Sequence, residues 1–336
     1  MRNMFKIMEK LLAAGEALVL VTVTASSGAT PRGVGARMLV GKSGRIRGTI
    51  GGGAVEHRSE QMALNILERR ASGQHSFSLN RNDVQNLGMI CGGAVSVFFH
   101  YIPAGDVETL ALARESERLF ESGQAIWLLS NIGNGGALSL YTRKEGFIGP
   151  SCPAWLVENL PRKPQHICIN GADFCVEQIN SPGRVYIFGG GHVSQELEPI
   201  LTHVGFRCVV LEDRPEFATR ELFPTAEEIK LIDFENIADS VHIGKDDYVC
   251  VMTRGHAYDT IVQAQILRYH PYYVGVIGSR NKAAAVRKTL KEEHGLSEEE
   301  LDHVTTPIGL KIGAETPAEI AISIAAQMIQ LRAQPQ

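Results

Sequence analysis

The sequence predicts an α/β protein in which an N-terminal α+β domain precedes a domain built on a doubly wound parallel sheet. The chain has 336 residues, a length typical of two domains. Apolar residues make up 44% and charged residues 21%, as in a soluble protein with sizeable cores. Strands and hairpins dominate the first half. Strand–loop–helix units repeat in the second half, a pattern that favours a parallel sheet covered on both faces.

Several classes of protein are disfavoured by composition. A net charge of −4 gives no basic footprint for nucleic acid. No apolar run approaches the ~20 residues of a membrane span, and the N-terminus has no pattern of a signal peptide. The six cysteines have no paired spacing, which argues against a disulfide framework and a structural zinc site. We therefore expect a cytoplasmic protein.

The first domain is expected over residues 1–150, with alternating helices and strands. Its expected helices are residues 2–14, 54–71 and 106–122. Its expected strands are residues 17–25, 37–40, 46–49, 94–101, 125–130 and 137–141, with a hairpin turn at 41–44.

A linker is expected over residues 151–182, because prolines and a glycine are frequent within and directly beside this segment. These residues are Pro150, Pro153, Pro161, Pro164, Pro182 and Gly183. The alternative is that residues 166–179 pair as strands.

The second domain is expected over residues 183–336. Its apolar strands are expected at 185–188, 206–211, 248–252 and 273–277. The sequence TPAE at 316–319 is a capping box with proline at the first helical position, and it predicts a last helix from Pro317 to about Leu331.

A glycine turn follows the first strand of this domain. Gly189-x-Gly191-x-x-Ser194 approximates the Rossmann dinucleotide fingerprint, with serine where glycine or alanine is usual. Asp213 comes 22 positions after Gly191, where an acid binds a ribose hydroxyl. The alternative is a Rossmann scaffold without a cofactor. The candidate cofactor contacts are Gly189, Gly190, Gly191, His192 and Asp213.

Two more loops leave the same expected sheet edge. Arg254, Arg280 and Lys282 are candidates to neutralise phosphate charge, and Ser279 is a candidate hydrogen-bond donor. The alternative is that these are solvated residues at helix starts. His256 is a candidate acid–base group or an ordinary surface histidine.

Three glycine-rich clusters in the first domain, at 29–37, 48–56 and 88–93, each adjoin an apolar run. Glycines beside strands let backbone amides approach a ligand closely. The candidate contacts are Arg32, Gly33, Arg37, Gly51, Gly52, Gly53, Glu56, Cys91 and Gly92. For Glu56 the alternative is capping of a helix. Cys91 is either a reactive, metal-facing thiolate or a small core residue.

These three clusters resemble the signatures of the xanthine dehydrogenase accessory factor family, XdhC/CoxI. The second domain resembles that family's Rossmann domain through residues 185–191, Asp213 and 307–317. Lys311 departs from the pattern, because an acidic residue is expected there in most members. This departure bears on any ligand contact of the loop before the last helix.

The resemblance implies a maturation factor for molybdenum hydroxylases such as xanthine dehydrogenase. Such a factor binds the molybdenum cofactor, as molybdopterin or its dinucleotide form, and keeps its terminal sulfur in place with a cysteine desulfurase. It then passes the cofactor to the apo molybdenum hydroxylase. Cys91 is the implied catalytic and metal-facing residue, and a homodimer is expected. The alternatives are an NAD(P)-dependent oxidoreductase, for which the first domain shows no obvious hydride-transfer catalyst, and an inert scaffold.

Two further expectations concern the site itself. Arg32, Gly52 and Cys91 are expected to line one pocket that faces the Rossmann edge across a cleft. Neighbouring amides and arginine charge are expected to lower the pKa of Cys91 below its ordinary value of ~8.5.

Overall fold

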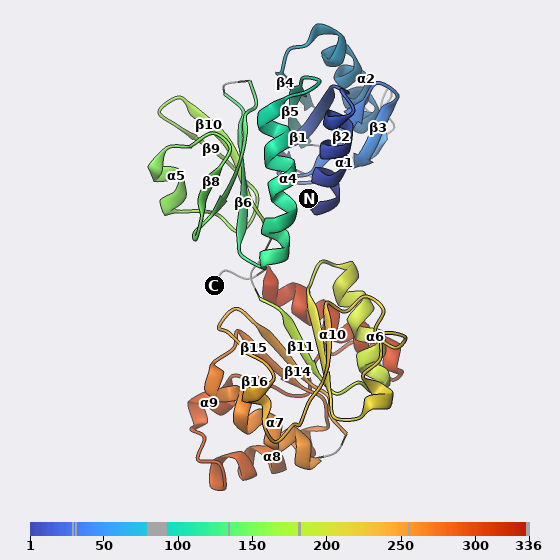
Figure 1. Ribbon diagram of the computed structural model, residues 1–336, viewed down its shortest axis with the longest axis vertical. Coiled ribbons are helices and arrows are strands. Elements are labelled where there is room, and N and C mark those ends of the chain that lie inside the picture. Colours follow the sequence, from blue (N-terminus) through green and yellow to red (C-terminus); the bar gives the residue numbers. More distant parts are fainter. Residues whose placement is uncertain are drawn as a thin grey trace. The chain divides into compact units, whose positions relative to one another are not determined.

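The structure is a computed structural model that describes residues 1–28, 30, 32–78, 93–133, 135–180, 183–254 and 256–333, with only the backbone of residues 256 and 257. Contacts divide the chain into two compact units, Met1–Ser181 and Pro182–Gln336 (Figure 1). Within the described ranges, no helix combines the length and the apolar character needed to cross a bilayer.

The first unit contains two antiparallel sheets. One has the strand order β3-β2-β1-β5-β4 and the other β8-β7-β6-β10-β9. The strands of the first sheet are β1 (Leu18–Gly28), β2 (Arg37–Gly41), β3 (Gly44–Gly48), β4 (Gly73–Ser78) and β5 (Gly93–Ile102). Those of the second are β6 (Ile126–Asn131), β7 (Leu138–Thr142), β8 (Gly146–Ile148), β9 (Gln165–Ile169) and β10 (Ala172–Asn180).

Helices complete the cores of this unit. The helices are α1 (Arg2–Ala13), α2 (Gly53–Arg69), α4 (Val107–Ser122) and α5 (Ala154–Glu158). Helix α2 covers one face of the first sheet, where its Val55 and Ala63 join a cluster with Val21 of β1. Helices α1 and α4 share a core with both sheets, to which Leu20 and Leu128 contribute. The expected α+β domain is therefore present.

The segment expected as a linker is folded and belongs to the first unit. It carries α5, β9 and β10, and β10 is hydrogen-bonded between β6 and β9, so the alternative of paired strands is what occurs. The prolines bound these short elements rather than keeping the chain extended. Pro153 precedes α5, and the carbonyl of Pro161 accepts a hydrogen bond from the indole of Trp127 at 2.9 Å. Residues such as Phe174 are buried, which fixes the segment to the sheet.

The second unit is a six-stranded parallel sheet of order β13-β12-β11-β14-β15-β16. Its strands are β11 (Val185–Phe188), β12 (Cys208–Glu212), β13 (Glu228–Leu231), β14 (Tyr248–Val251), β15 (Tyr273–Val276) and β16 (Val304–Thr305). Its α-helices are α6 (His192–His203), α7 (His256–Ile266), α8 (Arg280–Glu292), α9 (Glu298–Asp302) and α10 (Pro317–Arg332). Short 3₁₀ helices are η1 (Pro215–Phe217), η2 (Ile237–Asp239) and η3 (Leu267–Tyr269).

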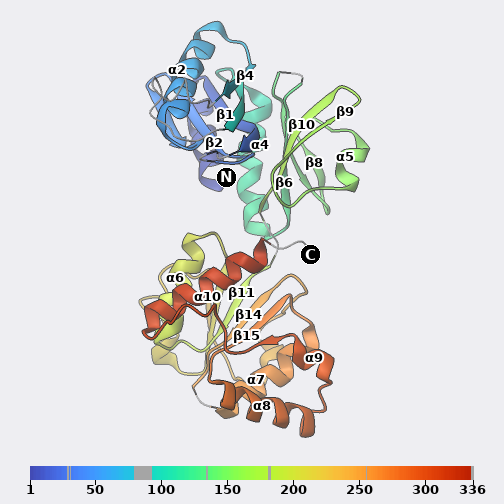
Figure 2. The ribbon, with the colours of Figure 1, turned by 180° about the vertical axis from the view of Figure 1, so that it is seen from behind.

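The sheet of this unit is covered on both faces. Leu197 of α6 and Ile324 of α10 pack on one face, and Val262 of α7 and Val286 of α8 pack on the other (Figure 2). This confirms the doubly wound parallel sheet that the strand–loop–helix pattern predicts. The predicted capping box of α10 is also present, since the Thr316 hydroxyl accepts from the Glu319 amide at 3.3 Å.

Candidate functional site

The strand register brings the glycine-rich clusters of the first unit to one end of its first sheet. Gly28, the last residue of β1, lies opposite Gly93, the first residue of β5. Strand β2 begins at the same end with Arg37, and Met38 lies opposite Gly48, the last residue of β3. The loops that leave these strand ends carry the first two clusters and adjoin the third.

Cys91 and Gly92 lie outside the described residues. Their expected roles, and the expected pocket shared by Arg32, Gly52 and Cys91, therefore stay predictions. Arg32 and Gly33 are exposed at this end of the sheet. Gly51, Gly52 and Gly53 all have positive φ angles, of 129°, 75° and 64°.

Glu56 is almost buried and fixes the glycine loop that precedes its helix. Its carboxylate accepts hydrogen bonds from the amides of Ile50 at 2.9 Å and Gly52 at 3.1 Å, and it also contacts Thr49 and Arg45. Burial alone would raise the pKa of Glu56, but these hydrogen bonds and the arginine charge outweigh it and lower the pKa. Glu56 thus binds the amides before its own helix, as the capping alternative predicts. It can affect a ligand only by holding the glycine loop in place.

Arg37 is not available to hold an anion, contrary to expectation. Its side chain is 2% exposed and forms an ion pair with Glu177 of the second sheet, while its Nη1 also donates to the carbonyl of Gly35 at 3.1 Å. A Cβ at Gly35 would lie 2.5 Å from that of Pro164, so the turn fits closely against the chain before β9. Arg37 therefore joins the two sheets and fixes the turn that carries Gly33.

The glycine turn of the second unit follows β11 as predicted, and the space around two of its three glycines has no room for a side chain. A side chain at Gly189 would clash with the carbonyl of Met252, and one at Gly190 would lie 2.6 Å from the carbonyl of Phe217. Gly191 has nothing within 4 Å of an added Cβ, so this position is open. The Ser194 hydroxyl donates to the Gly189 carbonyl at 2.5 Å, which explains the serine in the fingerprint.

Helix α6 begins directly after this turn, at the exposed His192. Among the described residues, none accepts a hydrogen bond from the amides of Gly191 and His192. Unpaired amides at a helix start, together with the helix dipole, attract an anion.

Glu212 is a functional candidate that sequence reasoning missed. It ends β12, is 1% exposed, and accepts from the Gly190 amide at 2.6 Å and from Arg214 Nε at 2.9 Å. Burial would raise the pKa of Glu212, but the hydrogen bonds of Arg214 and its neighbours lower it to about 2. The predicted Asp213 is the next residue, half-buried, and its hydrogen bond with Glu212 raises its pKa. The sequence shows two adjacent acidic residues, Glu212 and Asp213, but it does not show which of their side chains faces the glycine turn.

Three other predicted residues lie at the carboxyl ends of β14 and β15. Arg254, Ser279 and Arg280 are exposed there, and no described residue forms an ion pair with either arginine. Ser279 also accepts from the Lys282 amide at 3.3 Å, as the N-cap of α8. His256 is the first residue of α7, and its side chain lies outside the described part.

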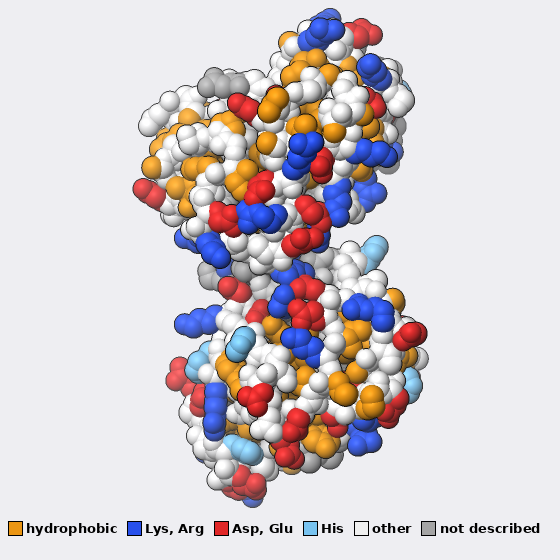
Figure 3. Space-filling model, in the orientation of Figure 1, with side chains coloured by type: hydrophobic (Ala, Val, Ile, Leu, Met, Phe, Trp, Pro, Cys, Tyr) orange, Lys and Arg blue, Asp and Glu red, His pale blue; other side chains and the backbone are white. Residues whose placement is uncertain are grey.

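The expectation that Lys282 is a spare cation for a phosphate is wrong. Its Nζ lies 2.5 Å from Oδ2 of Asp259, which is fully buried. The Thr253 hydroxyl donates to the other oxygen of Asp259 at 2.5 Å. On the surface, basic and acidic side chains are interspersed over the face of each unit that Figure 3 shows.

Comparison with known proteins assigns the family. The family model of the XdhC Rossmann domain matches residues 185–328, and that of the XdhC and CoxI family matches residues 11–78. The chain belongs to the XdhC and CoxI family. This confirms the resemblance predicted from the glycine-rich clusters.

Similar proteins cover the whole chain. A Bacillus subtilis protein described as a probable subunit of xanthine dehydrogenase is 27% identical, over 99% of this chain and 98% of its own length. The uncharacterized protein YqeB of Escherichia coli K12 is 25% identical over 98% of this chain, which spans 46% of that protein. A crystal structure described as a xanthine dehydrogenase from Bacillus halodurans has the same fold, with a TM-score of 0.81 at 23% identity, covering 99% of this chain and 96% of that chain.

Proposed function

We propose that this chain binds the molybdenum cofactor, keeps its terminal sulfur in place, and inserts it into an apo molybdenum hydroxylase of the xanthine dehydrogenase type. Membership of the XdhC and CoxI family supports the proposal. The structural observation that carries it is the edge of the parallel sheet in the second unit, where an open glycine turn, unpaired amides and exposed arginines come together.

This edge suits the phosphate of molybdopterin, or the diphosphate of its dinucleotide form. All six strands are parallel, so the loops after β11, β14 and β15 leave at one edge. The amides of Gly191 and His192 would hold a phosphate oxygen, and the absence of a side chain at Gly191 lets the group approach. Arg254 and Arg280 would supply compensating positive charge.

The sulfur chemistry is assigned to Cys91. A soft thiolate is a suitable ligand for a sulfur-ligated metal and a suitable acceptor of sulfur. In the sequence Cys91 comes two residues before Gly93, the first residue of β5, which pairs with Gly28 at the end of β1. The proposed partners are a cysteine desulfurase and the apo hydroxylase, and the proposed assembly is a homodimer.

The geometry weighs against the alternative of an NAD(P)-dependent oxidoreductase. An acid after the second strand of such enzymes accepts hydrogen bonds from a ribose. Here the carboxylate of Glu212 already binds the Gly190 amide and both Nε and Nη2 of Arg214. A dinucleotide in the usual position would have to displace these contacts.

A titration of the purified protein with isolated, sulfurated molybdenum cofactor tests the proposal. We expect saturable binding that Arg254→Gln weakens about 10- to 150-fold, since a charge-assisted contact contributes about 1.5–3 kcal/mol. Lys245→Gln is the matched control, because it removes one charge from the opposite end of β14. A copurifying nicotinamide instead of a pterin would support the oxidoreductase, and neither would support the scaffold.

A further inference from the structure

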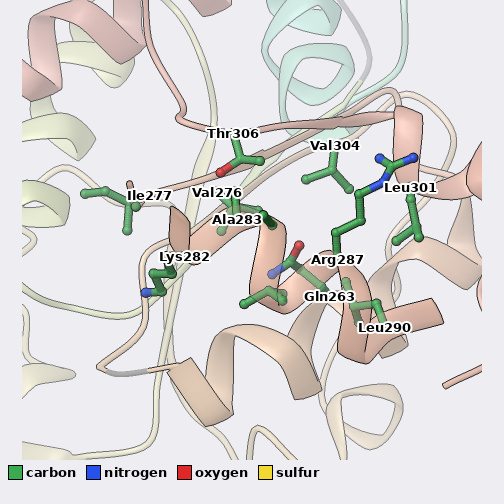
Figure 4. Close-up of a pocket in the computed structure, with 13 residues that line it drawn as sticks. Gln263, Val276, Ile277, Lys282, Ala283, Arg287, Leu290, Leu301, Val304 and Thr306 are labelled. Atoms are coloured by element: carbon green, nitrogen blue, oxygen red, sulfur yellow. The ribbon is translucent and has the colours of Figure 1, made fainter. Parts of the chain in front are cut away.

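A pocket of about 130 Å³ lies between the end of β15, helix α8 and helix α9 (Figure 4). Most of its wall is apolar, formed by Val276, Val286, Leu290, Leu301 and Val304. It extends to Gly278 and Lys282, at the carboxyl end of β15. The pocket therefore adjoins the same sheet edge as the glycine turn, two strands away.

The pocket exists because α8 presents small side chains to the sheet. Ala283 and Ala284 line it where larger residues would fill it. Ala285, next along the helix, is exposed and does not line the pocket.

A buried amide group gives this apolar pocket a specific polar contact. Gln263 is 3% exposed, and its Nε2 donates to the carbonyl of Asp259 at 2.9 Å. That bond fixes which end of the amide is oxygen. Gln263 Oε1 accepts no hydrogen bond from any described residue, and Figure 4 shows it directed into the pocket.

Gln263 Oε1 is accessible from the pocket and has no donor among the described residues. A ligand N–H that reaches it gains a hydrogen bond, whereas a purely hydrocarbon ligand gains none. The hydroxyl of Thr306 also lines the pocket and offers a second polar contact.

We infer that this pocket binds one ring of a planar nitrogen heterocycle whose N–H or amino group donates to Gln263. An apolar cavity of about 150 Å³ holds benzene, so the present space fits a single six-membered ring. The second ring of a bicyclic heterocycle would extend toward Lys282. One part of this inference rests on the proposed function, namely that the ring in this pocket belongs to the same ligand whose phosphate the glycine turn binds.

Pterins and nucleobases both have this chemistry, and a binding experiment distinguishes them. The full-length protein is titrated with pterin, with adenine and with toluene, the last having the ring but no donor. We expect pterin or adenine to bind, the tighter of the two identifying the source. Ala283→Leu, which fills the pocket, is expected to weaken binding at least tenfold, and Ala285→Leu is expected to leave it unchanged.

A second variant tests the hydrogen bond to Gln263 and leaves the side chains of α8 that line the pocket unchanged. Gln263→Leu is expected to weaken the heterocycle about tenfold and leave toluene unaffected. The inference is overturned if neither heterocycle binds the wild type, if Ala283→Leu and Ala285→Leu bind equally, or if Gln263→Leu has no effect. Normal binding of the complete molybdenum cofactor alongside any of these results would leave the proposed function standing.

Discussion

The buried ion pair between Arg37 and Glu177 provides a direct test of how the first unit is held together. The side chains are 2% and 9% exposed, and they join β2 of the first sheet to β10 of the second. Nε and Nη2 of Arg37 have no hydrogen-bond partner among the described residues. Glu177 is thus the main compensation for a buried positive charge, and Glu177→Leu removes it.

The expected loss is large. Removing one partner of a buried ion pair costs about 3–5 kcal/mol, because the remaining charge stays buried and unpaired. For a unit of this size, each kcal/mol lowers the melting temperature by roughly 2–4 °C. Glu177→Leu should therefore lower the melting temperature of the first unit by about 6–20 °C.

Thermal and urea unfolding of the variant measure this loss. Glu9→Gln is the control, because Glu9 forms an exposed pair with Arg114 and its loss should have little effect. Replacing both partners, as Arg37→Met with Glu177→Leu, should recover most of the stability. A change of under 1 kcal/mol for Glu177→Leu alone would refute the role given to the pair.

The other predictions concern the turn, the thiol and a buried histidine. Gly189→Ala should destabilise the second unit by about 1–3 kcal/mol in urea unfolding, since φ is 104° and a Cβ would clash, whereas Gly191→Ala should leave stability unchanged and weaken cofactor binding. Cys91→Ser should fold normally but lose sulfurated cofactor in a retention assay, while Cys208→Ser, at a buried position, should chiefly lower stability. Burial lowers the pKa of His100 to about 4, and a nearby aspartate opposes this shift only weakly. Because the pKa is lower in the folded state than the unfolded value of ~6.5, up to about 3 kcal/mol of stability is lost as pH falls from 6.5 to 4. His100→Gln should show a flatter dependence of melting temperature on pH in that range, and an unchanged slope would contradict this.

Much of the second unit follows from its sequence. Buried parallel strands appear as continuous apolar runs, and glycines mark the loops, so the sheet and the turn after β11 are predicted correctly. The acidic residue that contacts the glycine turn is harder to predict, because Glu212 and Asp213 are adjacent in sequence. Only the orientation of the strand decides which of the two side chains reaches Gly190. The Asp259–Lys282 pair joins the first turns of two separate helices, α7 and α8, which no local pattern reveals.

The first unit is harder to predict, because the expected linker supplies β9 and β10 to the second sheet, and β10 pairs with the distant β6 as well as with its neighbour in sequence, β9. Its prolines resemble those of a linker, although β10 is a central strand of that sheet. Arg37 lies in a glycine-rich cluster with the appearance of an anion site, yet its partner Glu177 is 140 residues away. Long-range pairing of this kind is set by packing and register, not by local composition.

Cofactor transfer is the measurement that tests the central claim most directly. The protein is loaded with sulfurated molybdenum cofactor and mixed with an apo hydroxylase of the xanthine dehydrogenase type, and the appearance of hydroxylase activity is followed. The account predicts faster and more complete activation than with the same amount of cofactor alone, and loss of this advantage with Cys91→Ser. Equal activation with and without the protein would contradict it.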